Sequence, residues 1–342
     1  MCAMKPLRMG IAGSGFGRKV LWPVFSEIEG VSVVALTGSP VTVPSNSAPT
    51  FFPSWREMIL SGTLDVVALA LPPLVQEEAA RVALEKGVHL FCEKPLALHA
   101  DAAEKLLRAA EERKRSVVVD FEFRKIPVFQ RLRESVARVG GLQSVEVEWL
   151  VANRDRRITS GSWKCEAARG GGAMNSFGCH LVDLCSAMFG RLEVIDYRTQ
   201  VHVSEYRSED GSVVPNTAED EFHLELHTQE KVPVRIHVNT AHSTQKGLLV
   251  RIQGERGALT LTHRHPENYF GGFDLTLDHP DAATEFLERS KDNDSGDARF
   301  RAVREVAKEF IEAIRKGGVP ECHLGIGVEN SRLIASARNR IK

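Results

Sequence analysis

One feature near the start of the chain restricts the fold more than any other. Residues 9–12 form a short apolar run, residues 13–18 read GSGFGR, and apolar residues at 20, 21, 24 and 25 then follow helical spacing. A strand that passes through a glycine turn into a helix is the setting in which backbone N–H groups and a helix N-terminus bind a dinucleotide pyrophosphate. The alternative is a tight strand-to-helix turn without a ligand.

Strands and helices alternate over the first 123 residues. The predicted strands are 31–36, 65–71, 88–92 and 116–121, and the predicted helices are 77–86 and 100–115. The proline-rich residues 40–53 disfavour a helix and are expected to form an irregular loop. This alternation predicts an α/β fold with a doubly wound parallel sheet, a Rossmann dinucleotide-binding domain that we assign to residues 1–123.

The pattern changes to period two after residue 124. Apolar and polar residues alternate at 145–151, 222–227 and 234–238, two strand-like runs flank the turn 254–257, and a helical stripe covers 303–314. Antiparallel strands with one buried face produce this alternation. We therefore assign residues 124–342 to an α+β domain that binds the substrate. A chain of 342 residues fits two domains of about 150 residues each.

Composition restricts the partners. Lys and Arg number 44 and Asp and Glu number 45, so the chain has no basic surplus for neutralising phosphates and nucleic acid is not expected as its main partner. No apolar run reaches the length of a membrane helix, and residues 1–8 lack the apolar stretch of a secretion signal. These observations predict a cytoplasmic protein with a small-molecule substrate and no membrane contact.

The end of the second strand bears on cofactor choice. An NAD site places Asp or Glu there to bind the ribose hydroxyls, whereas residues 30–56 contain no carboxylate. The strand ends instead at Thr37 and Ser39, whose hydroxyls suit a 2′-phosphate, and Arg18 or Lys19 can add positive charge. The cofactor is therefore NAD(P)(H), with NADP(H) favoured. A solvated helix face is the alternative for the two basic residues.

A lysine follows the strand at 88–92. Residues 92–95 read CEKP at the sheet edge where α/β proteins bind ligands, and Lys94 there can donate a proton to a hydroxyl or carbonyl oxygen. With the glycine loop, this segment resembles the Gfo/Idh/MocA family, also called the glucose-fructose oxidoreductase and inositol dehydrogenase family. Further similar segments are FRKIP at 123–127, Trp163 with the glycines at 170–172, GCHLVD at 178–183 and FIEAI at 310–314.

The resemblance implies NAD(P)-dependent hydride transfer to or from a hydroxyl, carbonyl or imine group of a sugar-like small molecule. It also implies a large, mostly antiparallel open sheet through which copies assemble into a dimer or tetramer. Carried over by position, the catalytic residues are Lys94 and His180, and the substrate-binding residues are Arg124, Trp163 and Ser176. The cofactor-binding residues are Gly13, Gly15, Phe16, Gly17, Thr37, Ser39, Leu71, Pro72, Glu93 and Lys94.

Three positions depart from the family pattern. Ser176 stands where the family has an aspartate, so it can form hydrogen bonds but brings no charge. Gln76 stands where many members carry histidine, and Glu122 where many carry asparagine. These departures leave open a non-catalytic NAD(P)-binding sensor or assembly protein. They also leave open an enzyme whose tightly held cofactor is oxidised and reduced within a hydrolysis or elimination.

Two histidine pairs bear on metal binding. His223 with His227, and His263 with His265, each share one face of a predicted strand. We find no carboxylate or cysteine at ligand spacing with either pair, so we expect surface histidines and no metal site.

Overall fold

A computed structural model describes residues 5–40, 48–152, 163–207, 211–267, 271–290 and 299–340. The chain forms two compact units: unit 1 comprises Met1–Glu122 and Arg299–Ser331, and unit 2 comprises Phe123–Ala298 and Arg332–Lys342. The predicted division into 1–123 and 124–342 differs from these units at residue 123 and, more substantially, at residues 299–331. The physical reason is helix α7 (Arg299–Lys316), whose apolar face is buried in the core of unit 1.

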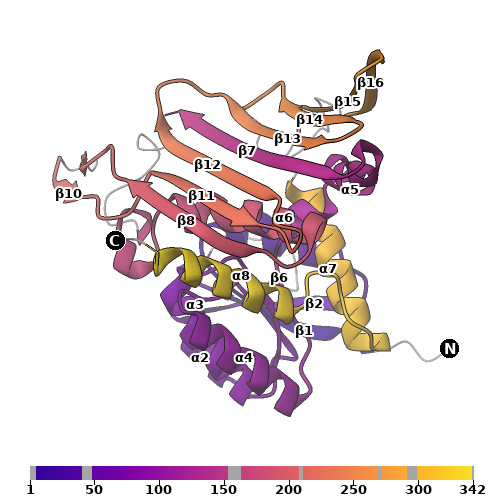
Figure 1. The fold of residues 1–342 in the computed structure, drawn as a ribbon. Helices are drawn as coiled ribbons and strands as arrows, with labels where there is room; N and C mark the ends of the chain where they lie inside the picture. Colours follow the sequence, from indigo (N-terminus) through magenta and orange to yellow (C-terminus); the bar gives the residue numbers. More distant parts are fainter. Residues whose placement is uncertain are drawn as a thin grey trace. The chain divides into compact units, whose positions relative to one another are not determined.

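Unit 1 is a six-stranded parallel sheet in the order β3-β2-β1-β4-β5-β6, with helices around it (Figure 1). The strands are β1 (Leu7–Ala12), β2 (Val31–Thr37), β3 (Thr50–Phe52), β4 (Val66–Leu69), β5 (His89–Cys92) and β6 (Val117–Val119). The helices are a π-helical turn η1 (Gly17–Leu21), α1 (Trp22–Ser26), α2 (Trp55–Leu60), α3 (Pro73–Glu85), α4 (Ala100–Arg113) and α7. This strand order is that of a Rossmann sheet, and the predicted doubly wound fold is confirmed.

Local sequence explains most of these elements. All four residues of β4 are buried and apolar, as expected for an inner strand covered on both faces. Gly87 follows α3 with φ +74°, a backbone conformation that favours glycine at a helix end. The prediction of an irregular loop at 40–53 is wrong for Thr50–Phe52, which form the edge strand β3 and pair with β2. Residues 41–47 of this segment lie outside the described residues. Pro49 and Pro53 flank this strand, and an edge strand tolerates prolines beside it. Ser54 caps the following helix α2 by accepting the Glu57 N–H at 3.2 Å.

Unit 2 contains an eight-stranded sheet in the order β16-β15-β14-β13-β7-β12-β11-β8. These strands are β7 (Leu142–Ala152), β8 (Glu193–Gln200), β11 (Glu221–His227), β12 (Pro233–His242), β13 (Gly247–Gly254), β14 (Gly257–His263), β15 (Phe273–His279) and β16 (Ala282–Arg289). Every neighbouring pair is antiparallel except β7 with β12. The predicted large, mostly antiparallel sheet is confirmed. A small pair, β9 (Glu205–Arg207) and β10 (Val213–Pro215), lies apart from it.

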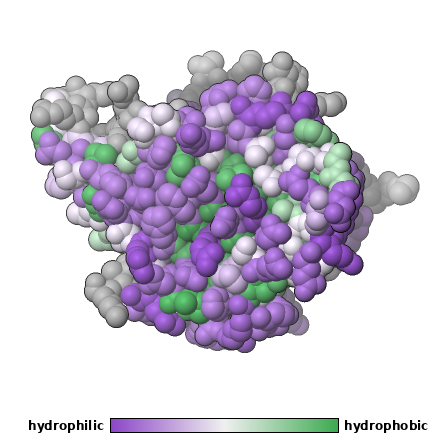
Figure 2. Space-filling view, turned by 45° about the horizontal axis from the view of Figure 1, so that its top comes forward, coloured by the Kyte–Doolittle hydropathy of each residue, from purple (hydrophilic) through white to green (hydrophobic). Residues whose placement is uncertain are grey.

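The two faces of the large sheet differ. Apolar residues such as Phe222 and Leu224 are buried on the face where helices α5 (Pro127–Ser135) and α6 (Cys179–Phe189) lie (Figure 1). The alternate residues of β11 and β12 are polar and at least partly exposed. Figure 2, which brings the top of Figure 1 forward, shows a largely hydrophilic surface with scattered hydrophobic residues.

The last helix, α8 (Leu324–Arg338), begins in unit 1 and ends in unit 2. Among the helices of the described residues, none has the length and apolar character needed to cross a membrane.

Candidate functional site

The three glycines of the loop in unit 1 have different surroundings. A Cβ on Gly13, which has φ +131°, would lie 2.4 Å from the carbonyl oxygen of Ala70. A Cβ on Gly15 would meet nothing within 4 Å, so the backbone there is open to a ligand. A Cβ on Gly17 would lie 3.3 Å from Ile11, where the helical turn passes close to β1. Turn, ligand approach and helix–strand contact are the three roles of a dinucleotide-binding loop.

Arg18 lies across the end of β2. Its Nη2 donates to the carbonyl oxygens of Thr37 at 2.8 Å and Ser39 at 2.6 Å, and its guanidinium lies 5.5 Å from the centre of the Phe51 ring. Thr37 is buried, and its hydroxyl oxygen accepts the Gly13 N–H at 3.0 Å. Thr37 therefore supports the glycine turn, and Arg18 places a fixed positive charge at the strand end.

The predicted cofactor residues share one edge of the parallel sheet. Residues 13–17 follow β1, Thr37 and Ser39 end β2, Leu71 and Pro72 come between β4 and α3, and Glu93 and Lys94 follow β5. Carboxyl ends of parallel strands meet at a single edge, which is where doubly wound folds bind ligands. The structure thus brings these residues to one edge of unit 1.

Lys94 is held by a buried side chain from α3. Gln76 donates from Nε2 to the carbonyl oxygens of Glu93 at 2.5 Å and Pro95 at 3.0 Å. The Glu93 N–H donates in turn to the carbonyl oxygen of Leu69 at 2.8 Å. The backbone is therefore fixed on both sides of Lys94, and Gln76, at the position of the family histidine, acts through the backbone.

Two buried carboxyl groups follow the neighbouring strand β6. Asp120 is 0% exposed and Glu122 is 3% exposed. The Asp120 N–H donates to the carbonyl oxygen of Cys92 at 2.8 Å, so Asp120 stands beside Glu93 at the strand ends. Three carboxyl groups thus gather around Lys94 at this edge of the sheet.

These carboxyl groups keep protons that ordinary carboxyl groups lose. Burial raises the pKa of Glu122 to about 8, and the negative charge of Glu93 adds to the rise while Lys94 opposes it. Burial, together with the charges of Glu122 and Glu93, raises the pKa of Asp120 well above its usual range. Burial also raises the pKa of Glu93. Like charges in a low-dielectric site cannot all ionise, so this carboxyl cluster (Glu93, Asp120 and Glu122) binds protons more readily than separate, exposed carboxyl groups do.

Arg299, at the start of α7, joins this edge from the far end of the chain. Its guanidinium lies 5.8 Å from the centre of the Phe16 ring in the glycine loop, and its charge acts on Glu93 and Glu122. No sequence pattern indicates Arg299, because only the packing of α7 into unit 1 brings it here. Asp120 was also missed, because the predicted strand 116–121 included it, whereas the observed strand β6 ends at Val119.

In unit 2, His180 lies on α6 among aromatic rings. It is buried, and its ring stacks on Phe123 with 4.5 Å between the ring centres. Phe123 also lies 5.7 Å from Trp149, whose ring contacts Phe177 edge-on at 4.8 Å. These contacts fix the plane of the imidazole.

Arg124 forms a buried ion pair within unit 2. Its Nε donates to Asp183 Oδ2 at 2.8 Å and its Nη2 to Oδ1 at 2.7 Å, and the Asp183 side chain is 1% exposed. A two-bond arginine–carboxylate pair of this kind is strong and directional. Because Asp183 comes three residues after His180 on α6, Arg124 holds the helix that carries the histidine.

Ser176 and Trp163 lie near the glycine run of the same unit. Ser176 is half-buried in a π-helical turn (Met174–Gly178) before α6, and its N–H donates to the carbonyl oxygen of Gly172 at 3.1 Å. A Cβ on Gly171 would lie 2.4 Å from the carbonyl oxygen of Lys164, next to half-buried Trp163. The glycine run therefore permits close backbone contact between these segments. Lys94 belongs to unit 1 and these residues to unit 2.

A Rossmann sheet with a dinucleotide loop, followed by a large open sheet, defines a class of nucleotide-dependent oxidoreductases. Residues 7–121 match the model of the oxidoreductase family with an NAD-binding Rossmann fold, and residues 129–260 match the GFO/IDH/MocA C-terminal domain. The chain belongs to the Gfo/Idh/MocA family.

Relatives extend over the whole chain. An uncharacterized oxidoreductase of Synechocystis sp. is 26% identical over 342 residues, which cover 96% of this chain and 92% of the relative. Levoglucosan dehydrogenase in complex with NADH and L-sorbose superposes with a TM-score of 0.81 at 18% identity, covering 98% of both chains. A super-repressor mutant of Gal80p from Saccharomyces cerevisiae superposes with a TM-score of 0.79 at 19% identity, covering 98% of this chain and 95% of that one. The two structures share the fold of this chain.

Proposed function

We propose that the protein is an NADP(H)-dependent oxidoreductase that transfers hydride to or from a hydroxyl, carbonyl or imine carbon of a sugar-like small molecule. The observation that carries this proposal is the place of Lys94. It stands at the cofactor edge of a Rossmann sheet, with its backbone fixed by Gln76. A bound nicotinamide would supply or accept the hydride there, and a positioned lysine is suited to handle the accompanying proton.

The glycine loop fits a dinucleotide, and its surroundings favour NADP(H). Gly15 leaves the backbone open where a pyrophosphate would approach. Arg18, held by two carbonyl oxygens at the end of β2, puts a permanent cation where a 2′-phosphate would lie. Ser39 is exposed beside it and can donate its hydroxyl proton. Phe16, Leu71, Pro72 and Glu93 complete the proposed cofactor contacts.

The chemistry assigned to this chain is the movement of one proton. In the reducing direction Lys94 donates a proton to the substrate oxygen as the carbonyl becomes a hydroxyl, and in the oxidising direction it accepts that proton. The carboxyl cluster beside Lys94 is a local proton store, since Glu122 has a pKa raised by burial to about 8. A proton given up by Lys94 is replaced from this store.

The residues of unit 2 are assigned to the substrate. His180 has a fixed ring plane and orients the substrate oxygen through a ring nitrogen. Arg124 is a positioning residue, because it acts by holding α6 through Asp183. Ser176 accepts or donates one hydrogen bond to a substrate hydroxyl, and Trp163 supplies an apolar surface. Because Ser176 is uncharged, it favours a substrate whose hydroxyl group at this position does not require a carboxylate as its hydrogen-bond partner.

Fluorescence titration with NADPH and NADH tests the cofactor half of the proposal. Wild-type protein should bind NADPH at least about tenfold more tightly than NADH, because a charge-assisted contact is worth about 1.5–3 kcal/mol. Arg18→Ala should lose that preference and leave NADH binding within about twofold. Lys19→Ala, a neighbouring exposed lysine, is the matched control. Failure to bind either nucleotide contradicts the proposal.

A non-catalytic sensor or assembly protein is the second candidate. Ser176 in place of the family aspartate favours it. The chain also shares its fold with Gal80p and is 24% identical over 291 residues to GAL80 of Saccharomyces cerevisiae, which is described as a galactose/lactose metabolism regulatory protein. Nucleotide binding without turnover across sugars, ketones and imines would support this candidate. Nucleotide retained through purification, with no net absorbance change at about 340 nm during turnover, would indicate transient oxidation instead.

We further infer that copies assemble through the large sheet of unit 2 and that the protein works in the cytoplasm. Light scattering during gel filtration tests the first point, with a mass of two or four chains of 37.8 kDa expected. A single-chain mass at micromolar concentration would contradict it.

A further inference from the structure

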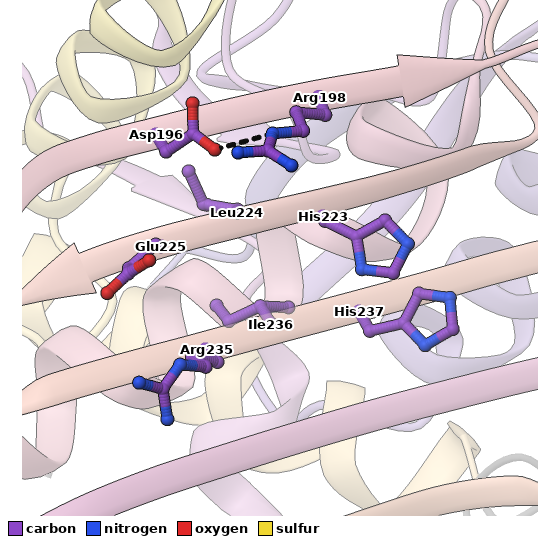
Figure 3. Close-up of a pocket in the computed structure, with 8 residues that line it drawn as sticks. All are labelled: Asp196, Arg198, His223, Leu224, Glu225, Arg235, Ile236 and His237. Atoms are coloured by element: carbon purple, nitrogen blue, oxygen red, sulfur yellow. Dashed lines mark ion pairs between the residues drawn. The ribbon is translucent and has the colours of Figure 1, made fainter.

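The polar face of β11 and β12 carries a cluster that no single sequence segment reveals. Glu221 and His223 are two residues apart on β11 and therefore project from the same face. His237 on β12 is the register partner of His223, and Figure 3 shows the two imidazoles side by side. One ligand atom from each of the three residues lies within 4.8 Å of the others.

The distances are close to those of a coordination sphere. His237 Nε2 lies 2.8 Å and His223 Nε2 lies 3.3 Å from the same oxygen, Glu221 Oε1. In a tetrahedral zinc site with bonds of about 2.0–2.1 Å, neighbouring ligand atoms are roughly 3.3 Å apart. The two rings are stacked with 4.1 Å between centres, so only small rotations would direct both nitrogens at one ion.

A second carboxylate orients one of the histidines. Glu148 Oε2 lies 3.3 Å from His237 Nδ1, the nitrogen opposite the one that faces Glu221. Histidine ligands in metal sites commonly donate their other N–H to a carboxylate, which fixes the tautomer. His202 contacts the other carboxylate oxygen of Glu221 through Nε2.

The surroundings include cations as well. The depression of about 330 Å³ beside the histidines is also lined by Arg198 and Arg235 (Figure 3). Arg198 pairs with Asp196 at 2.8 Å, and Glu225 lines the same depression. Their charges are therefore partly offset.

We propose that Glu221, His223 and His237 bind a divalent transition-metal ion, with Zn²⁺ as the best match. Two imidazole nitrogens and one carboxylate oxygen are donors that zinc accepts, whereas Mg²⁺ and Ca²⁺ require mainly oxygen. Three protein ligands leave a coordination position for water or an external ligand. The His223 side chain is 59% exposed, so an ion can reach the site. The proposal differs from the expectation of a surface histidine without a metal at 223, because Glu221 stands at ligand spacing. It does not depend on the proposed function.

Calorimetric titration of the full chain with Zn²⁺ after chelator treatment and dialysis tests the site. We expect one ion per chain in the wild type. His223→Gln and His237→Gln should each weaken binding at least about tenfold, and Glu148→Gln about tenfold through lost orientation. His227→Gln is the matched control, because it lies on the same strand and face beside Glu225 at 3.8 Å. This control should change the affinity by less than about twofold.

Co²⁺ absorption gives a second readout. An intense visible spectrum, as expected of a four- or five-coordinate ion, should form with the wild type and vanish with Glu221→Gln. The proposal is overturned if the wild type binds no Zn²⁺. It is also overturned if His223→Gln or His237→Gln binds Zn²⁺ as tightly as the wild type does, or if His227→Gln loses as much affinity as they do. In each of those cases the residues form an ion-pair network only. Circular dichroism checks that the variants keep their fold.

Discussion

Unit 1 and unit 2 each contain a buried polar cluster, and the two clusters combine charges differently. The carboxyl cluster of unit 1 gathers like charges, and burial keeps protons on them. In unit 2, buried Arg124 and Asp183 have opposite charges and meet in two hydrogen bonds. Burial of unbalanced groups favours proton storage, whereas burial of a matched pair favours rigidity. The difference fits the roles proposed above, in which unit 1 provides the proton chemistry and unit 2 a rigid frame for the substrate.

The largest expected effect is on turnover. Lys94→Met removes the group that donates the proton, so kcat should fall about 10²–10⁴-fold, the range for general acid–base catalysis. NADPH should still bind, because the backbone of this segment remains fixed by Gln76 and the glycine loop is unchanged. Steady-state kinetics and fluorescence titration measure the two quantities. Lys86→Met, at an exposed lysine after α3, is the control. Full turnover in Lys94→Met would contradict the proposal that Lys94 donates the proton.

The next effect is on stability and concerns unit 2. Arg124→Met leaves the Asp183 carboxylate buried without its cation and should lower the free energy of unfolding by about 3–5 kcal/mol. The double variant Arg124→Met with Asp183→Leu should recover most of this loss. Asp120→Asn in unit 1, by contrast, relieves like-charge repulsion and keeps a polar side chain beside Glu93, so it should lower the free energy of unfolding by less. Urea denaturation measures the free energy of unfolding of both variants. Equal losses in Arg124→Met and Asp120→Asn would contradict the proposed difference between the two clusters.

A smaller effect is a pH dependence of stability in the wild type. Folding raises the pKa of Glu122 from its ordinary value of 4.5 to about 8, so the folded state binds more protons than the unfolded state in this range. Stability should therefore fall as pH rises from about 4.5 to about 8. Glu122→Gln should make this fall shallower, as measured by urea midpoints at several pH values. An unchanged slope in the variant would show that Glu122 does not hold the proton.

The smallest effect concerns the departure at Ser176. Ser176→Asp should raise the apparent pKa on the acidic side of the rate profile by about one unit, because a carboxylate one helical turn before His180 favours the charged imidazole. Ser176→Asn brings a polar group without charge and should leave the profile in place. Identical pH–rate profiles for Ser176→Asp and Ser176→Asn would show that residue 176 is not close to the group that titrates.

Local periodicity accounts for what could be predicted of the fold. Alternating strands and helices indicate the Rossmann sheet, and period-two patterns indicate the antiparallel strands of unit 2. The return of residues 299–331 to unit 1 depends on which core buries the apolar face of α7. Periodicity shows that such a face exists but not what it packs against. The edge strand β3 is only three residues long and is flanked by Pro49 and Pro53, so the sequence has no clear pattern that predicts its pairing with β2.

The candidate site was predictable to a different extent in each unit. Gly13, Gly15 and Gly17 stand in one segment whose sequence pattern is visible, and Lys94 follows a strand end that is visible in the sequence. Arg299 reaches the glycine loop only through tertiary packing. The cluster of Glu221 and His223 with His237 depends on strand register, which no single segment encodes.

The most direct test of the central claim follows hydride and proton in one experiment. Wild-type protein and Lys94→Met are each mixed with NADPH deuterated at C4 and a panel of sugar-like carbonyl compounds, and products are analysed by mass spectrometry. The account predicts deuterium on a product carbon with the wild type and a large loss of that product with Lys94→Met, although both bind NADPH. Deuterium transfer at equal rates in both proteins, or NADPH binding without any transfer by the wild type, would contradict it.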